Sequence, residues 1–301
     1  MKKVVLFSLF ILVSLLSHAQ SNARINNYWE NTYYINPAAI DDDYRAVFSM
    51  AARKQWFGVP GAPGTVFGTG TVYIDNMQTQ FGVKLLADEI GYTHTMNASL
   101  SYAYSVHLDD WWRLHLGIAA SIQSLSYDLS AVNTETLNDP AFLTKLLKTN
   151  NYNSDLGAQL TNNELTVGLS SQNIFSKFFK ENALQTNTNF LYAKYRKKSN
   201  QTVDMQYGVA AINYGTTLQM EFSLTSYFKY YNEPDIFQVG LFYRTRSDMG
   251  VLLGVNLGNN THLWYSYDYN VGGIQKNLIG THELMLVYKL NKKAGCIHCD
   301  K

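Results

Sequence analysis

The stretch MNASLSYAYSV, residues 96–106, alternates between two kinds of side chain along its whole length. Its even positions carry Met, Ala, Leu, Tyr, Tyr and Val, whereas its odd positions carry Asn, Ser, Ser, Ala and Ser. A period of two residues places successive side chains on opposite faces of an extended chain. The stretch therefore predicts a β-strand with one apolar face and one face of small, mostly hydroxylated side chains.

The same alternation recurs in other parts of the chain. In one of these runs Leu116 and Ile118 share the apolar face, and His115 and Ser121 share the other face. A helix would scatter such residues around its circumference, so the pattern predicts an all-β protein. The other runs are residues 218–225, 263–269 and 284–290.

The length of the strands distinguishes between a soluble sandwich and a membrane barrel. Several runs reach ten residues, whereas strands of globular sheets are typically about 5–6 residues long. A tilted strand needs about 9–11 residues to cross the hydrocarbon layer of a membrane. The small, serine-rich face also suits a barrel lumen, so we predict a transmembrane antiparallel β-barrel of about 14 strands in the outer membrane. The expected strands are residues 45–54, 66–75, 79–87, 95–107, 112–126, 154–161, 164–171, 187–196, 203–213, 217–228, 236–245, 249–257, 261–269 and 281–290.

The composition agrees with this architecture. Aromatic residues make up 14% of the chain and charged residues only 16%, against about 25% charged residues in a typical soluble domain. The mean hydropathy of −0.18 excludes a protein built from several apolar helices of about 20 residues. A net charge of +1 provides no basic field that would bind nucleic acid.

The first residues have the three parts of a secretory signal peptide. Lys2 and Lys3 precede an apolar run over residues 4–16, and Ser17-His18-Ala19 supplies a cleavage site. We therefore expect an exported chain that begins at Gln20. The expected organisation is a signal peptide over 1–19, a periplasmic or plug segment over 20–44, the barrel over 45–290 and a periplasmic tail over 291–301.

Two motifs raise the question of chemistry. Cys296 and Cys299 are spaced like zinc ligands or a redox pair, but only His298 accompanies them. In an oxidising compartment we expect these cysteines to form a disulfide or to remain as two thiols without a function. We expect no bound metal and no cofactor. A barrel lipase would need a Ser-His pair, for which His115 is the candidate base. The chain has no Gly-x-Ser-x-Gly motif, and we expect no enzymatic activity.

Short motifs along the mature chain resemble one known family. Together and in this order they are similar to the PorP/SprF family of outer-membrane proteins of the type IX secretion system, found in Bacteroidetes. One departure is Gly64-Thr65, where the family often has Thr-Thr. The motifs are Asn36-Pro37-Ala38, Arg53-Lys54-Gln55-Trp56-Phe57-Gly58, Gly61-Ala62-Pro63, Asp88-Glu89-Ile90-Gly91, Ser101-Tyr102-Ala103-Tyr104, Tyr127-Asp128-Leu129, Gly168-Leu169-Ser170-Ser171-Gln172-Asn173 and His282-Glu283-Leu284-Met285-Leu286.

The resemblance implies a non-enzymatic component of protein secretion. Its implied partners are secretion subunits of a periplasmic ring and motor, together with a secreted surface protein or adhesin of the gliding type. The alternative function is an outer-membrane channel for small hydrophobic molecules, with residues 20–44 as a plug.

An aromatic turn is the strongest candidate for contact with a partner, because aromatic side chains contribute much of the binding energy of interfaces. The alternatives are an anchor at the membrane interface and a loop folded into the lumen. The long connection 127–153 is the second candidate. The candidate residues of the turn are Arg53, Gln55, Trp56, Gly58, Gly61, Ala62 and Pro63.

Overall fold

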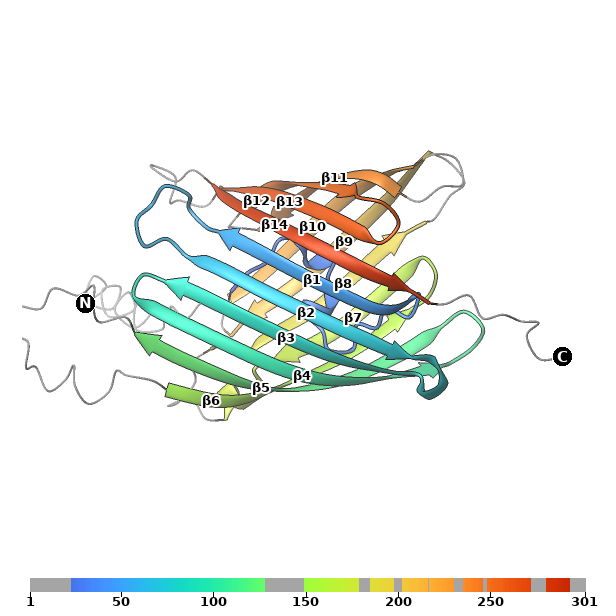
Figure 1. Ribbon diagram of the computed structural model, residues 1–301, viewed down its shortest axis with the longest axis horizontal. Helices are drawn as coiled ribbons and strands as arrows, with labels where there is room; N and C mark the ends of the chain where they lie inside the picture. Colours follow the sequence, from blue (N-terminus) through green and yellow to red (C-terminus); the bar gives the residue numbers. More distant parts are fainter. Residues whose placement is uncertain are drawn as a thin grey trace, which may run out of the picture.

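Fourteen antiparallel strands close into a barrel in the computed structural model (Figure 1), which describes residues 23–127, 149–178, 185–197, 202–215, 217–229, 235–245, 248–271 and 280–292. Each strand pairs with its neighbours in sequence, and β1 pairs with β14. The strands are β1 (Tyr44–Lys54), β2 (Gly64–Ile74), β3 (Thr79–Ile90), β4 (Thr93–His107), β5 (Arg113–Tyr127), β6 (Thr149–Thr161), β7 (Leu165–Gln172), β8 (Thr188–Arg196), β9 (Val203–Tyr214), β10 (Thr217–Lys229), β11 (Asp235–Arg244), β12 (Asp248–Asn256), β13 (Thr261–Asn270) and β14 (Thr281–Asn291).

These strands confirm the predicted fold class. Most boundaries fall within two residues of the expected ones, but β6 begins at Thr149, five residues before the expected start at 154. Its first residues are mostly polar, so hydrophobicity gave no sign of a strand there. The ladder nevertheless continues, since Tyr152 pairs with Ile122 of β5.

Side chains alternate between the two faces of the wall as the sequence predicts. Leu116 and Ile118 point outward and are about half exposed, whereas His115 and Gln123 on the same strand are fully buried. Large apolar side chains cover the outside of the barrel on every strand. An apolar band that surrounds a closed barrel is the surface that meets lipid in outer-membrane proteins.

The two ends of the barrel differ in their connections. Tyr44 and Asn291 pair with each other and lie at one end. Short connections join the strands there. The strand ends that flank the longest connections lie at the opposite end: Tyr127, Thr149, Gln172 and Thr188. Bacterial barrels have short turns on the periplasmic side, so we assign the end with Tyr44 and Asn291 to the periplasm.

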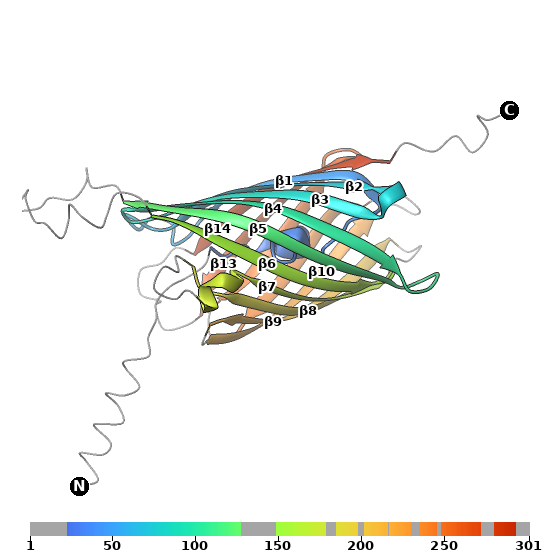
Figure 2. The ribbon, with the colours of Figure 1, turned by 90° about the horizontal axis from the view of Figure 1, so that it is seen from below.

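Residues 23–43 lie inside the ring of strands, as the dark-blue segment in Figure 2 shows. The segment begins at the outer end, where Arg24 lies 3.7 Å from Asp248. It ends at the periplasmic end, where Asp42 pairs with Arg113, and continues directly into β1. Its short 3-10 helices are η1 (Asn27–Trp29) and η2 (Thr32–Tyr34); two others, η3 (Asp75–Met77) and η5 (Ile174–Lys177), lie in connections between strands.

Among the described residues, no helix has both the length and the apolar character that crossing a membrane requires.

Candidate functional site

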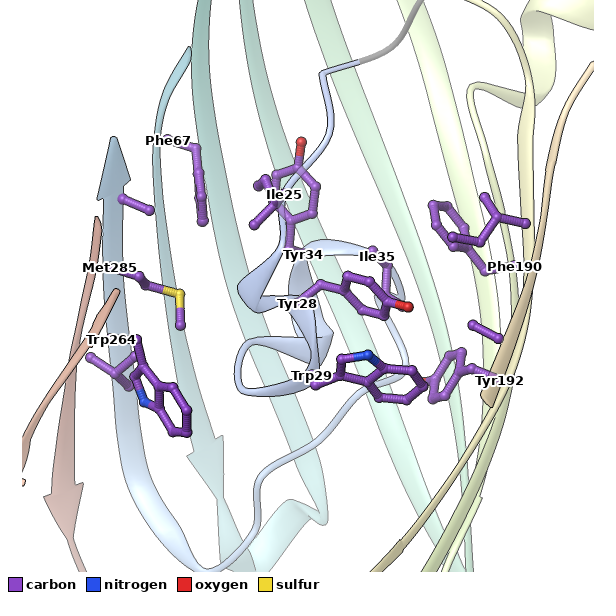
Figure 3. Packing of buried hydrophobic residues seen from close by; sticks show 14 of the residues in the cluster. Ile25, Tyr28, Trp29, Tyr34, Ile35, Phe67, Phe190, Tyr192, Trp264 and Met285 are labelled. Carbon is purple, nitrogen blue, oxygen red and sulfur yellow. The ribbon is translucent and has the colours of Figure 1, made fainter. Parts of the chain in front are cut away.

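The core of the molecule lies in the lumen, between residues 23–43 and the barrel wall. Figure 3 shows Trp29 of this lumen segment against Tyr192 of β8, with ring centroids 6.4 Å apart. Tyr34 packs on Phe67 of β2 at 4.9 Å. The remaining buried apolar members of the cluster are Ile25, Tyr28, Ile35, Ala51, Leu86, Phe190, Ala210, Ile212, Tyr227, Trp264, Met285 and Val287.

One carboxylate of the wall receives the start of the lumen segment. Glu283 of β14 is 1% exposed, and it accepts hydrogen bonds from the backbone N–H of Asn26 at 2.8 Å and of Asn27 at 3.0 Å. The Asn27 side chain donates to the same carboxylate at 2.8 Å. The Asn26 amide donates to Asp268 of β13 at 2.7 Å. Hydrogen bonds to a buried charge are stronger than those between neutral groups, so these bonds hold this end of the segment together with the packing of Ile25, Tyr28 and Trp29.

Two buried arginines neutralise the carboxylates of the wall. Arg53 of β1 bridges Asp268 at 3.0 Å and Glu283 at 3.3 Å. Arg244 of β11 pairs with Glu221 of β10 and also donates to the Asn26 side-chain oxygen at 2.8 Å. The Trp29 indole N–H donates to Glu221 at 2.8 Å. Buried charges require such partners, because removing one partner leaves an uncompensated charge inside the protein.

The later part of the lumen segment is held instead by close packing against glycines of the wall. Glycines of the wall face it, and a Cβ on Gly117 would lie 2.5 Å from the Ala38 nitrogen. A Cβ on Gly157 would collide with the Asn36 side-chain oxygen. The Asn36 amide donates to the Tyr192 hydroxyl at 2.9 Å. The Asn-Pro-Ala motif thus lies against one glycine of β5 and one of β6. Because glycine has no side chain, the motif can come close to the backbone of both strands.

Tyr33 occupies a similar position on β3. Its hydroxyl lies 2.6 Å from the Ser101 Oγ, above Gly82, which has no side chain to exclude it. Burial raises the pKa of the Tyr33 phenol to about 12. The phenol is therefore neutral at physiological pH, and this contact is a hydrogen bond between neutral groups.

An open cavity of about 890 Å³ lies at the periplasmic end of the lumen. Its inner boundary is the stretch from Trp29 to Tyr33, and its sides carry charged residues of the wall. The acidic run Asp41–Asp43 lines its edge. Asp41 lies 3.5 Å from Lys289, and Asp42 pairs with Arg113, so two ion pairs tie the end of the lumen segment to β14 and β5.

The aromatic turn 55–63 lies at the outer end and is held by neighbouring turns. The Phe57 N–H donates to Gly280 at 3.1 Å, and the Gly91 N–H donates to Gly61 at 3.0 Å. Trp56 has a φ of 48°, a conformation that non-glycine residues rarely adopt. Phe57 is 54% exposed and packs edge-on against His282. Uncommon backbone conformations of this kind persist where the surroundings enforce them, and they cluster at functional sites.

The structure separates the expected residues of the turn into two places. Gln55, Trp56, Gly58, Gly61 and Pro63 lie in the turn or at its edge, with Ala62 buried in it. Arg53 lies in the lumen, 6% exposed, where it belongs to the buried ion network. Cys296 and Cys299 fall outside the described residues, as does most of the connection 127–153.

Sequence reasoning did not single out the four charged residues that hold the lumen segment together with Arg53. These are Glu221, Arg244, Asp268 and Glu283. The sequence does contain a pattern that could have identified them. Each lies on the polar face of an alternating strand, where the other residues are mostly uncharged. A charge at such a position faces the lumen and requires a partner there.

His115, the candidate base of a lipase, lies in the lumen wall opposite Ser105 of β4 in the ladder. Both residues are fully buried, and no hydrogen bond joins their side chains. A nucleophile and its base need to be within hydrogen-bond reach of each other and of a substrate. In the described part of the chain, no three His, Cys, Asp or Glu residues come together in a way that could hold a metal ion.

Solved structures similar to this one are outer-membrane barrels. The toluene transporter TodX of P. putida has 10% identity and a TM-score of 0.50, with 87% of this chain and 94% of that chain covered. Omp33 of Acinetobacter baumannii has 9% identity and a TM-score of 0.46, with 82% and 98% covered. Identities this low demonstrate a shared fold and nothing further. A search of curated proteins gives no match.

The family comparison covers nearly the whole chain. Residues 17–288 match the family described as type IX secretion system membrane protein PorP/SprF. The matched range includes the lumen segment and almost all of the barrel, so both belong to the shared architecture. The family and the closed barrel with its apolar outer surface place the protein in the outer membrane. The chain belongs to the PorP/SprF family of type IX secretion system membrane proteins.

Proposed function

We propose that the protein is a non-enzymatic scaffold of type IX secretion that supports the secretion or surface attachment of a large protein, such as an adhesin of the gliding type. The observation that carries this proposal is the family match over residues 17–288. A family that belongs to a secretion system favours a protein as client, and the barrel contributes a rigid support in the membrane.

The proposed site of client contact is the aromatic turn 55–63. Loops on a rigid scaffold are the usual place for binding residues, and this turn is fixed by backbone hydrogen bonds to two neighbouring turns. Exposed Phe57 and half-buried Trp56 provide apolar area at the outer end. The proposed partners at the other end are subunits of the periplasmic ring and motor, which would meet the short turns there.

The alternative is a channel for small hydrophobic molecules. The likeness to a toluene transporter is one of fold alone. The lumen contains residues 23–43, and its wall is rich in buried polar and charged side chains. A path for apolar solutes would need an apolar lining, so we favour the scaffold.

The test changes Trp56 to Ala and measures the client protein on the cell surface, normalised to folded barrel in the membrane fraction. Surface display should fall while the amount of folded barrel is unchanged, because the turn lies beyond the spanning strands. The matched control is Trp111→Ala, which removes an exposed indole from a turn at the periplasmic end. Unchanged display in Trp56→Ala and in a 130–150 deletion would contradict docking at the outer loops. Uptake of toluene by cells that express the protein would instead support the channel.

A further inference from the structure

The lumen segment is fastened to the barrel in two chemically different ways. Residues 25–31, here called the latch, make polar contacts mainly with charged groups of the wall: Glu283, Asp268, Glu221, Arg244 and Lys194. Residues 33–42, here called the seat, bind mostly through neutral hydrogen bonds and glycine contacts. Its charged contacts are the ion pairs of Asp41 and Asp42 and the hydrogen bond from Lys84 to the Tyr34 carbonyl. The two parts can therefore respond differently to one perturbation.

The latch can leave without breaking the ion pairs of the two buried arginines of the wall. Arg53 remains paired with Asp268 and Glu283, and Arg244 remains paired with Glu221. The penalty of a buried charge without a partner, which would oppose release, therefore does not arise at these residues. Lys194 of β8 loses the Trp29 carbonyl, but it lines the periplasmic cavity, where water can solvate it. The groups that the latch contributes to its polar contacts are amides, peptide N–H and C=O groups, one indole and the Glu30 carboxylate, which accepts from Tyr227. Water can hydrogen-bond all of these groups after release.

The seat cannot leave in the same way. Gly82, Gly117 and Gly157 let it lie directly against the backbone of three strands. Asp41 and Asp42 hold its end to Lys289 and Arg113, and Tyr44 continues into β1. The seat is therefore a fixed point, and the hinge between the two parts lies near Thr32.

The latch is also what bounds the periplasmic cavity on its inner side. Trp29, Glu30 and Asn31 line the cavity of about 890 Å³. The start of the latch lies near the outer end, where Arg24 is close to Asp248. Displacement of the latch would therefore extend the cavity toward the outer end of the lumen.

We propose that the latch, residues 25–31, is a releasable gate, whereas the seat, residues 33–42, stays bound to the wall. Release of the latch opens a water-filled path through the barrel. The gate is closed in the structure. Its apolar side chains, Ile25, Tyr28 and Trp29, are buried in the lumen core, so opening requires a driving interaction from outside the barrel. The proposal concerns the lumen alone and does not depend on which protein is secreted.

The test measures arabinose entry into liposomes that contain the purified full-length mature protein. Asn26→Ala with Asn27→Ala removes side-chain bonds from the latch while leaving every residue of the wall in place. Each lost hydrogen bond should raise the open population on the order of fivefold, so the swelling rate should rise by about tenfold or more. Tyr33→Phe is the matched control, because it removes one hydrogen bond from the seat, and its rate should equal that of the wild type.

A second latch variant covers the case in which the double variant does not fold. Trp29→Phe keeps an aromatic ring but removes the N–H that donates to Glu221, and it should raise the swelling rate about fivefold. Heat-modifiable mobility in gels checks that each barrel is folded. Wild-type rates in both latch variants, or an equal increase in Tyr33→Phe, would overturn the proposal. This assay contains no client and no secretion subunit, so its failure would leave the proposed secretion role untouched.

Discussion

Gly157→Ala should unseat the Asn-Pro-Ala motif, although it adds only one methyl group. The new Cβ would collide with the Asn36 side-chain oxygen and lie 3.2 Å from the Pro37 Cδ. Asn36 is fully buried, and its side chain makes three hydrogen bonds. It donates to the Ala158 carbonyl at 3.1 Å and to the Tyr192 hydroxyl at 2.9 Å, and it accepts from the Ala38 N–H at 2.9 Å. Displacement of Asn36 weakens all three bonds at once.

The size of the effect follows from these contacts. Overpacking a buried site costs about 1–3 kcal/mol, and each buried polar group left without a partner costs about 1–3 kcal/mol. Alanine stiffens the unfolded chain and returns about 0.4–1 kcal/mol. Because water and small backbone shifts recover some of the hydrogen bonds, we expect a loss of about 2–4 kcal/mol in the free energy of unfolding.

The measurement is a urea titration of the purified barrel in lipid vesicles, followed by tryptophan fluorescence. Gly68→Ala is the matched control, because its Cβ would point outward and lie 3.8 Å from the nearest atom, the Ser49 carbonyl oxygen. This variant should raise stability by about 0.4–1 kcal/mol, because alanine stiffens the unfolded chain and meets no clash in the folded one. In an Asn36→Ala background, Gly157→Ala should cost much less than in the wild type, since the colliding group is gone. Equal losses for Gly157→Ala and Gly68→Ala, or the same loss without Asn36, would refute the seating argument.

Two further predictions concern the barrel as a membrane protein. Ile118→Arg places a charge on the lipid face near mid-strand, where Ile118 is 51% exposed. It should lower the free energy of unfolding by about 2–4 kcal/mol in a folding titration in bilayers, against about 0–1 kcal/mol for Tyr127→Arg at the strand end. Equal losses would contradict this assignment of depth. Truncation after Asn291 should leave a heat-modifiable barrel in the membrane fraction, because β14 ends there and closes on β1. A truncated chain absent from the outer membrane would show that the removed tail carries a signal needed for insertion.

The strands were predictable because the signal that defines them is local. Alternation of the kind seen over residues 96–106 can be recognised from adjacent residues alone. It recurs on every strand because one face of the wall meets lipid and the other meets a polar lumen. The same rule extended to Arg53 would have placed it in the lumen with Ala51, since both alternate with outward Met50 and Ala52. Arg53 directly precedes the turn of Trp56 in sequence, but it lies on β1 and its side chain belongs to the lumen.

The contents of the lumen were decided only by the tertiary structure. Asn27 and Glu283 are 256 positions apart in the chain, and Asn36 and Tyr192 are 156 apart, so no local pattern connects either pair. Nor does a glycine in a strand reveal that another backbone lies against it. Periodicity determined which face of each strand is polar, because that depends on the residue's own position in an extended chain. What those polar faces hold depends on closure of the barrel, which brings fourteen strands around one short segment and places Arg53 of β1 beside Asp268 and Glu283.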